Sequence, residues 1–153
     1  YGENLRSAPA PAGALETGRG IFKALPLLRD LPFLEVLADI WTDFPLSELP
    51  DEPDGQAHLV LVDNPAHHPE GDFVLSADRV TQGSGACLTF SGIGVYRPEL
   101  FTGCSAGAFP LAPLLRQAME EGRVSGSHYR GGWFDIGTPE RLQEVNDVVI
   151  NRQ

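Results

Sequence analysis

Two aspartates, Asp39 and Asp135, occupy similar places in the sequence. Asp39 follows the apolar run "FLEVLA", and Asp135 lies between Phe134 and Ile136 in "GGWFDIGTPERLQEVN". A carboxylate among apolar neighbours costs free energy unless something positive pairs with it. In open α/β sheets, ligands gather at the carboxyl ends of strands, and Mg²⁺ prefers one or two carboxylates with waters and phosphate oxygens. One interpretation is that the two aspartates share one Mg²⁺. Alternatively, Asp39 is a turn residue whose side chain caps the next segment, and Asp135 is a solvated residue at the end of a strand.

Two glycine-containing motifs could lie against a ligand. "LETGRG" (residues 15–20) precedes a predicted helix, so its backbone N–H groups could bind an anion or sugar hydroxyls, or Thr17 could simply cap that helix. "FSGIG" (residues 90–94) places glycines inside a predicted strand. Glycine there indicates either the close approach of a ligand or another backbone, or a β-bulge.

Adjacent histidines in "DNPAHH", His67 and His68, raise the possibility of a zinc site. Neighbouring residues in a loop rarely chelate one ion, and no cysteine or third histidine stands at a matching spacing. We therefore predict a surface loop here. The sequence contains neither a G-x-S-x-G nucleophile motif nor a P-loop.

Composition excludes several classes of partner. The formal net charge is −10, Lys23 is the single lysine, and the arginines are scattered, so we expect no nucleic acid partner. An acidic protein can still bind phosphorylated small molecules through a divalent metal. No apolar run reaches the length of a membrane span and no signal peptide is visible, so we expect no membrane association. Cys87 and Cys104 are predicted to be thiols of a cytoplasmic protein.

The elements that must position these residues alternate between strand and helix. The runs at 32–40 and 57–62 are mostly apolar, which is typical of strands covered on both faces. Thr138 is placed to cap a final helix with Pro139 at its first position. We predict one α/β domain with a mostly parallel or mixed sheet. The other predicted elements are a helix at 21–28, strands at 72–76, 87–97 and 129–135, and a helix at 109–122 that ends at Gly122.

Most of the chain resembles a known family. The segments that carry the resemblance are "LETGRGIFKALPLL", "DIWTDF", "HLVLVDNPAHHPEGDF", "TFSGIGVYRPELF" and "AFPLAPLLRQAMEEGRVSGSHYRGGWFDIGTPERL". They resemble the sugar-1-phosphate nucleotidyltransferases, and most closely the N-acetylmuramate-1-phosphate uridylyltransferase branch. The resemblance implies a three-layer, Rossmann-like α/β fold with a mostly parallel mixed sheet. Residues 1–153 would form a single domain, the carboxyl-terminal two-thirds of such an enzyme.

The resemblance also implies a reaction and a set of site residues. A uridylyl group would pass from UTP to a sugar 1-phosphate, with N-acetylmuramate 1-phosphate favoured, releasing pyrophosphate in cytoplasmic peptidoglycan recycling. Magnesium would be the cofactor, and catalysis would rest on positioning and electrostatics. Asp39 and Asp135 would be the catalytic, metal-holding pair. The substrate-binding residues would be Glu16, Thr17 and Gly18 on the sugar or nucleotide side, and Gly71, Asp72, Ser91 and Gly92 facing the sugar.

Three departures from the family pattern bear on activity. The glycine-rich triphosphate loop and its following Pro-Lys pair do not occur, Leu37-Ala38 stands in place of Asn-Gly, and Arg19 stands in place of glycine. A missing amino-terminal segment or a partner subunit would have to supply the triphosphate contacts. Besides the uridylyltransferase, two hypotheses stay open: a mannose-1-phosphate guanylyltransferase, and a non-catalytic module that binds a sugar phosphate or a partner.

Overall fold

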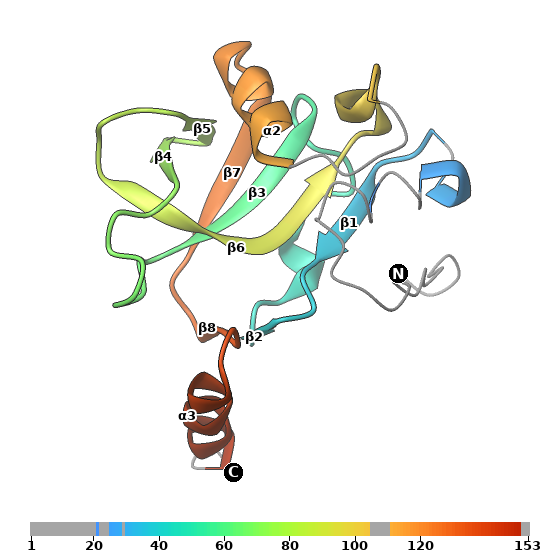
Figure 1. Ribbon diagram of the computed structural model, residues 1–153. Coiled ribbons are helices and arrows are strands. Elements are labelled where there is room, and N and C mark those ends of the chain that lie inside the picture. Colours follow the sequence, from blue (N-terminus) through green and yellow to red (C-terminus); the bar gives the residue numbers. More distant parts are fainter. Residues whose placement is uncertain (1–20, 22–24, 29, 105–110, 151–153) are drawn as a thin grey trace.

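Six strands form one mixed sheet. The computed structural model describes residues 21, 25–28, 30–104 and 111–150, without the side chains of 148–150. The strand order is β1-β6-β3-β7-β5-β4, and β4 also pairs with the start of β6. Figure 1 shows β6, β3 and β7 crossing the middle of the molecule. The strands are β1 (Phe33–Val36), β3 (Ala57–Val62), β4 (Phe73–Ser76), β5 (Arg79–Thr81), β6 (Cys87–Tyr96) and β7 (Val124–Tyr129).

The α/β fold class and the mixed sheet are confirmed, but the parallel share is smaller than predicted. Strands β3 and β7 are parallel, whereas the other described pairings are antiparallel. A tight turn joins β4 to β5, and a short connection leads from β5 into β6. Short connections suit antiparallel neighbours, because a parallel pair needs a long crossover.

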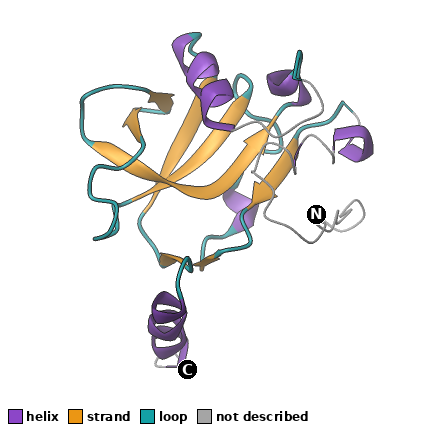
Figure 2. Cartoon of the chain, viewed as in Figure 1, coloured by secondary structure: helices purple, strands orange, loops and turns teal. Residues whose placement is uncertain are grey.

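Helix α2 (Leu111–Glu120) covers one face of the sheet (Figures 1 and 2). Its buried residues, Leu111, Leu115, Ala118 and Met119, form an apolar stripe. They pack into a core with the inward side chains of β3 and the short 3₁₀ helix η2 (Pro98–Phe101). The helix ends as predicted, since Gly122 has a φ of +67° and its N–H bonds to the carbonyl of Met119. Ile21 and residues 25–28 are helical, in agreement with the helix predicted at 21–28.

Strand β3 is buried on both faces, as predicted, but β1 is not. In β1 the exposed residues are Leu34 and Val36, at 40% and 45%, while Phe33 and Glu35 are partly buried. The prediction of a doubly covered strand was therefore wrong for β1. Among the described strands, β1 pairs with β6 and stands at the end of the sheet, and an edge strand need not be covered on both faces.

Two predicted strands are each interrupted, and the pieces form a second, two-stranded sheet. The run at 32–40 breaks after Val36, and β2 (Ile40–Thr42) follows a turn. The run at 129–135 belongs partly to β7 and partly to β8 (Trp133–Asp135). Strands β2 and β8 pair antiparallel at one end of the main sheet, and α3 (Pro139–Ile150) extends beyond them (Figure 1).

The second break occurs where Gly132 passes over Asp43. Gly132 N–H donates to Oδ1 of Asp43 at 2.6 Å, and its carbonyl accepts from Asp43 N–H at 3.2 Å. These bonds turn the chain from the main sheet to the β2–β8 pair.

Of the helices that the structure describes, none is long and apolar enough to span a membrane.

Candidate active site

A β-bulge in β6 is the centre of the site's framework. The register of β3 against β6 shifts between Val60 and Leu61, which leaves Ser91 and Gly92 as extra residues in β6. Gly92 has a φ of +81°, and a Cβ there would lie 2.8 Å from Cδ1 of Leu37. Both the backbone angle and the contact therefore require glycine. Of the two sequence interpretations of "FSGIG", the bulge is confirmed.

The bulge holds the segments that carry both aspartates. On one side, Leu37 N–H donates to the carbonyl of Gly92 at 2.9 Å, two residues before Asp39. On the other side, Nε1–H of Trp133 donates to the carbonyl of Ser91 at 2.9 Å, two residues before Asp135. One irregularity in β6 thus positions two segments that are far apart in the sequence.

The two aspartates meet at one pocket. Ile40 pairs with Asp135 in the β2–β8 sheet, and Ile136 N–H donates to the carbonyl of Asp39 at 2.6 Å. Both side chains line a pocket of about 350 Å³. Its other lining residues are Leu37, Ile40, Pro65, His67, His68, Asp72, Thr89, Phe90, Ser91, Gly92 and Trp133.

Asp135 has two side-chain partners in the structure. Its Oδ1 lies 3.1 Å from Nε2 of His67, and its Oδ2 accepts from Nη1 of Arg141 at 2.5 Å. Arg141 belongs to the first turn of α3, where its N–H bonds to Oγ1 of Thr138, which confirms the predicted N-cap. Gly137 leaves room for the guanidinium, because a Cβ there would lie 3.3 Å from Nη1.

The other predicted substrate residues serve the framework in the structure. Asp72 accepts from Phe90 N–H at 2.8 Å and lies 3.1 Å from Nε2 of His68, so both carboxylate oxygens have partners. The Ser91 hydroxyl is buried, donates to the carbonyl of Val60 at 2.7 Å and accepts from Ile93 N–H. Their contact with a sugar stays a prediction.

Gly71 and the "LETGRG" residues stand apart from these. Gly71 has a φ of +66° and packs on Asn64, so glycine serves the turn there, and it is not among the pocket-lining residues. Glu16, Thr17, Gly18 and Arg19 lie outside the described residues. Cys87 and Cys104 are both free thiols, as predicted.

His67 and His68 lie in a loop, as predicted, yet they line the pocket. Sequence reasoning assigned them no role because they do not have zinc-ligand spacing. The signal that could have found them is their place just beyond the carboxyl end of β3, the same position that pointed to the aspartates.

The donor set fits a magnesium ion. In the part of the chain that the structure describes, no three histidine, cysteine or acidic residues come together as a metal cage. Mg²⁺ does not need one, because it keeps several waters and binds through one or two carboxylates plus substrate phosphates. Asp39 and Asp135 offer two carboxylates to one pocket, and the Asp39 side chain is exposed.

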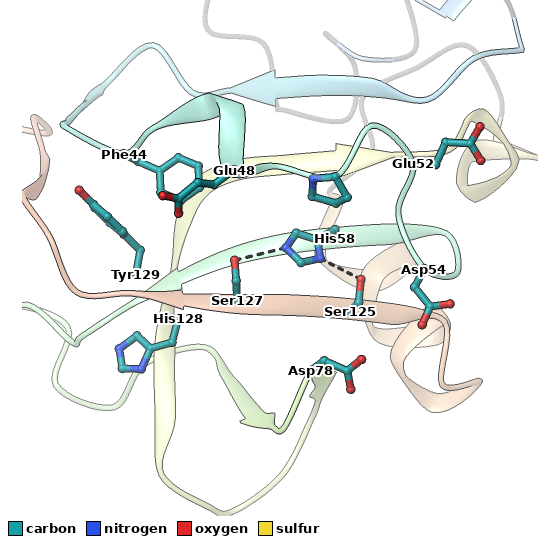
Figure 3. A pocket seen from close by; sticks show the side chains of 11 residues that line it. Phe44, Glu48, Glu52, Asp54, His58, Asp78, Ser125, Ser127, His128 and Tyr129 are labelled. Carbon is teal, nitrogen blue, oxygen red and sulfur yellow. Dashed lines mark hydrogen bonds between the residues drawn. The ribbon is translucent and has the colours of Figure 1, made fainter.

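A second hollow, of about 390 Å³, lies over β3 and β7 and does not include the paired aspartates. Figure 3 shows His58 at its floor, between the hydroxyls of Ser125 and Ser127, with acidic side chains around the rim. The ring nitrogens lie 2.9 Å and 3.2 Å from the two hydroxyl oxygens. Burial lowers the pKa of His58, while the charge of Asp78 opposes this shift.

No family model matches the chain, but individual relatives do. N-acetylmuramate alpha-1-phosphate uridylyltransferase of Neisseria meningitidis is 48% identical over 156 residues, a match that covers 95% of this chain and 67% of the relative. The chain belongs to this uridylyltransferase family. A relative of the same name from Caulobacter vibrioides is 31% identical over 141 residues, which cover 83% of this chain and 58% of that protein. The chain thus spans about two-thirds or less of the length of these family members.

Solved structures show the same fold at much lower identity. The inositol-1-phosphate CTP transferase of T. maritima has a TM-score of 0.69 at 16% identity, over 88% of this chain and 61% of that one. A putative glucose-1-phosphate thymidylyltransferase of Bacillus anthracis has a TM-score of 0.72 at 14% identity, over 90% and 62%. These likenesses show that the chain has the fold of the sugar-phosphate nucleotidyltransferases.

Proposed function

We propose that the chain carries the metal and acceptor side of a sugar-1-phosphate uridylyltransferase. The reaction is Mg²⁺-dependent transfer of a uridylyl group from UTP to a sugar 1-phosphate, with N-acetylmuramate 1-phosphate favoured, and release of pyrophosphate. The observation that carries this proposal is the convergence of Asp39 and Asp135 on one pocket. The 48% identical relative supports the choice of uridylyl donor and acceptor sugar.

The residues of the pocket would act by positioning and electrostatics. The acceptor phosphate attacks the α-phosphorus of the donor in line, so no protein nucleophile is needed. Asp39 and Asp135 would hold Mg²⁺, which supplies the positive charge that offsets the phosphates of both substrates. Arg141 orients Asp135 by binding Oδ2. Trp133 fixes the start of β8, the strand that carries Asp135. Pro65 and Phe90 give the pocket apolar lining.

The donor's triphosphate would be bound partly by residues outside this chain's described part. The chain spans about two-thirds of its 48% identical relative. We propose that residues 1–153 act as one domain, and that an additional amino-terminal segment or a partner subunit completes the nucleotide contacts. The free thiols and the absence of a membrane-spanning helix among the described residues are compatible with a cytoplasmic role in peptidoglycan recycling.

Pyrophosphate release from UTP and N-acetylmuramate 1-phosphate, with and without Mg²⁺, tests the proposal. We expect Asp135→Asn to lower the rate by at least about 100-fold, because losing a metal ligand should cost no less than losing an outer-shell partner. Asp30→Asn removes an exposed carboxylate that lines neither pocket and serves as the matched control. An unchanged rate in Asp135→Asn would refute the metal assignment.

A non-catalytic sugar-phosphate module is the second candidate, motivated by Arg19, which stands where the family has glycine. Calorimetry with UTP, GTP and N-acetylmuramate 1-phosphate separates the possibilities. Saturable sugar-phosphate binding without turnover supports the module, and turnover by the chain excludes it. Preference for GTP over UTP would instead indicate a guanylyltransferase.

A further inference from the structure

The two oxygens of Asp135 are held from different sides. Arg141 binds Oδ2 from the first turn of α3, over Gly137, and is not among the residues that line the pocket. His67 lies at Oδ1 and does line the pocket. Oδ1 is therefore the oxygen on the pocket side, where a bound ion would approach, and Oδ2 is the oxygen that anchors the carboxylate to the protein.

The loop that carries His67 is held by other contacts. Nδ2 of Asn64 donates to the carbonyls of Pro69 and Cys87, both at 3.0 Å, and Oδ1 of Asn64 accepts from Thr89. His68 bonds to Asp72 at the end of the loop. The His67 side chain is 38% exposed. The conformation of the loop therefore does not depend on the contact between His67 and Asp135. His67 can exchange that contact for one with a ligand without unfolding the loop.

The contact places a hydrogen-bond donor beside the candidate metal ligand. Nε2 of His67 lies 3.1 Å from Oδ1 of Asp135, a distance at which the two side chains pair when the ring carries a proton on Nε2. A divalent ion held by Asp135 would compete with the ring N–H for the carboxylate lone pairs. The N–H would then be free to bind another acceptor. A phosphate oxygen bound to that ion would be the nearest strong acceptor.

We propose that His67 is a substrate-binding residue of this site. Its Nε2 lies beside Oδ1 of Asp135, and its N–H would donate a hydrogen bond to a phosphate oxygen of the substrate when a divalent ion binds Asp135. Arg141, in contrast, favours ion binding. It is a positioning residue that keeps Oδ1 turned to the pocket. The proposal rests on the proposed function, since it takes the ligand to be a sugar phosphate bound with a divalent ion.

The first test is Mn²⁺ binding, measured by electron paramagnetic resonance on the 153-residue chain. We expect His67→Ala to tighten Mn²⁺ binding by about 3- to 10-fold, because Asp135 would lose a partner that competes with the ion for its lone pairs. Arg141→Gln should weaken it by about 10-fold or more, as loss of an outer-shell partner does. His128→Ala removes a similar histidine–aspartate pair, with Asp63 at 2.8 Å, outside this pocket, and should change nothing. Weaker or unchanged Mn²⁺ binding in His67→Ala would overturn the proposal.

The second test is phosphate binding, measured by calorimetry with saturating Mn²⁺. We expect His67→Ala to weaken binding of N-acetylglucosamine 1-phosphate by about 10-fold, and His67→Gln to recover part of the loss because the amide keeps a donor. Binding of N-acetylglucosamine, which has no phosphate, should not respond to either change. Equal phosphate affinity in the original chain and His67→Ala contradicts the proposal.

The two tests separate this inference from the proposed function. If UTP is not turned over but the Mn²⁺ and phosphate results hold, the reaction is wrong and the role of His67 stands. If turnover occurs and His67→Ala changes neither binding constant, the reaction stands and the role of His67 fails. A chain that binds no Mn²⁺ contradicts both.

Discussion

Glu35 is a buried carboxyl group next to a buried tyrosine. It stands opposite Gly94 in the β1–β6 pairing, and the Tyr96 side chain lies over that glycine. Burial raises the pKa of Glu35 to about 7, while the nearby Tyr96 hydroxyl opposes the shift. The pKa of Tyr96 is raised well above its ordinary value, first by burial and then by the charge of Glu35. Burial therefore favours the neutral form of both groups.

We expect Glu35 to make the chain less stable as pH rises. The folded-state pKa of about 7 exceeds the ordinary 4.5, so the stabilising protonated form is fully present below about pH 4.5 and is lost as pH rises through 7. The shift limits the effect to about 3 kcal/mol. Urea unfolding between pH 4.5 and 8 should show a shallower pH dependence for Glu35→Gln than for the original chain. Glu48→Gln, at an exposed position, should not flatten it. Equal slopes in all three proteins would show that Glu35 ionises normally.

At this scale the sequence predicted the carboxylates but not their partners. Asp39 and Asp135 were found because their position at strand ends follows from local pattern. His67 and Arg141 were not assigned to Asp135, because that contact depends on the path of the loop after β3 and on the angle at which α3 begins. Neither of these is a property of local sequence.

The bulge in β6 lets a single glycine influence the candidate metal site. We expect Gly92→Ala to destabilise the chain by about 2–3 kcal/mol, because alanine is strained at positive φ and its Cβ would meet Leu37. The displaced Leu37 should carry Asp39 with it and weaken Mn²⁺ binding. Thermal unfolding and Mn²⁺ titration measure the two effects.

Gly103 offers a matched control for Gly92. Its φ is +86°, but a Cβ there would have no atom within 4 Å. Gly103→Ala should therefore show the cost of the backbone angle without the contact, and it should leave Mn²⁺ binding unchanged. If the two variants behave alike, the contact with Leu37 does not position Asp39.

Elements were predictable where their signals were local, and their breaks were not. The apolar stripe and Gly122 defined α2, and Thr138 defined the start of α3. The runs at 32–40 and 129–135 each looked continuous, since the bonds that interrupt them come from distant residues. Leu37 bonds to Gly92, and Gly132 bonds to Asp43.

The exposed edge at β1 affects the behaviour of the molecule in solution. Among the described strands β1 pairs on one side, and Leu34 and Val36 present apolar surface there. Such edges promote strand-to-strand association, which a net charge of −10 opposes until salt screens it. We expect sedimentation velocity to show self-association that increases at high salt, and Val36→Lys to reduce it. Leu31→Lys makes the same charge change at a position outside the strands, 64% exposed, and should reduce it less. Equal effects of the two lysines would attribute the association to charge rather than to the edge.

The α/β class followed from the alternation of strand and helix patterns along the whole chain. The strand directions did not follow from local patterns. The turn between β4 and β5 and the position of β6 between β1 and β3 depend on tertiary contacts. The fold beyond the described residues stays a prediction.

The short β2–β8 pair also sets the order in which the molecule assembles. Its three residue pairs join segments such as Ile40 and Asp135, which lie 95 positions apart. Closing so long a loop costs more chain entropy than three residue pairs can offset by themselves. The β2–β8 pair should therefore form after the main sheet is in place. By the same reasoning it should open before the main sheet in hydrogen exchange. The two aspartates would then come together last during folding and separate first during fluctuations, while α2 and the central strands stay intact.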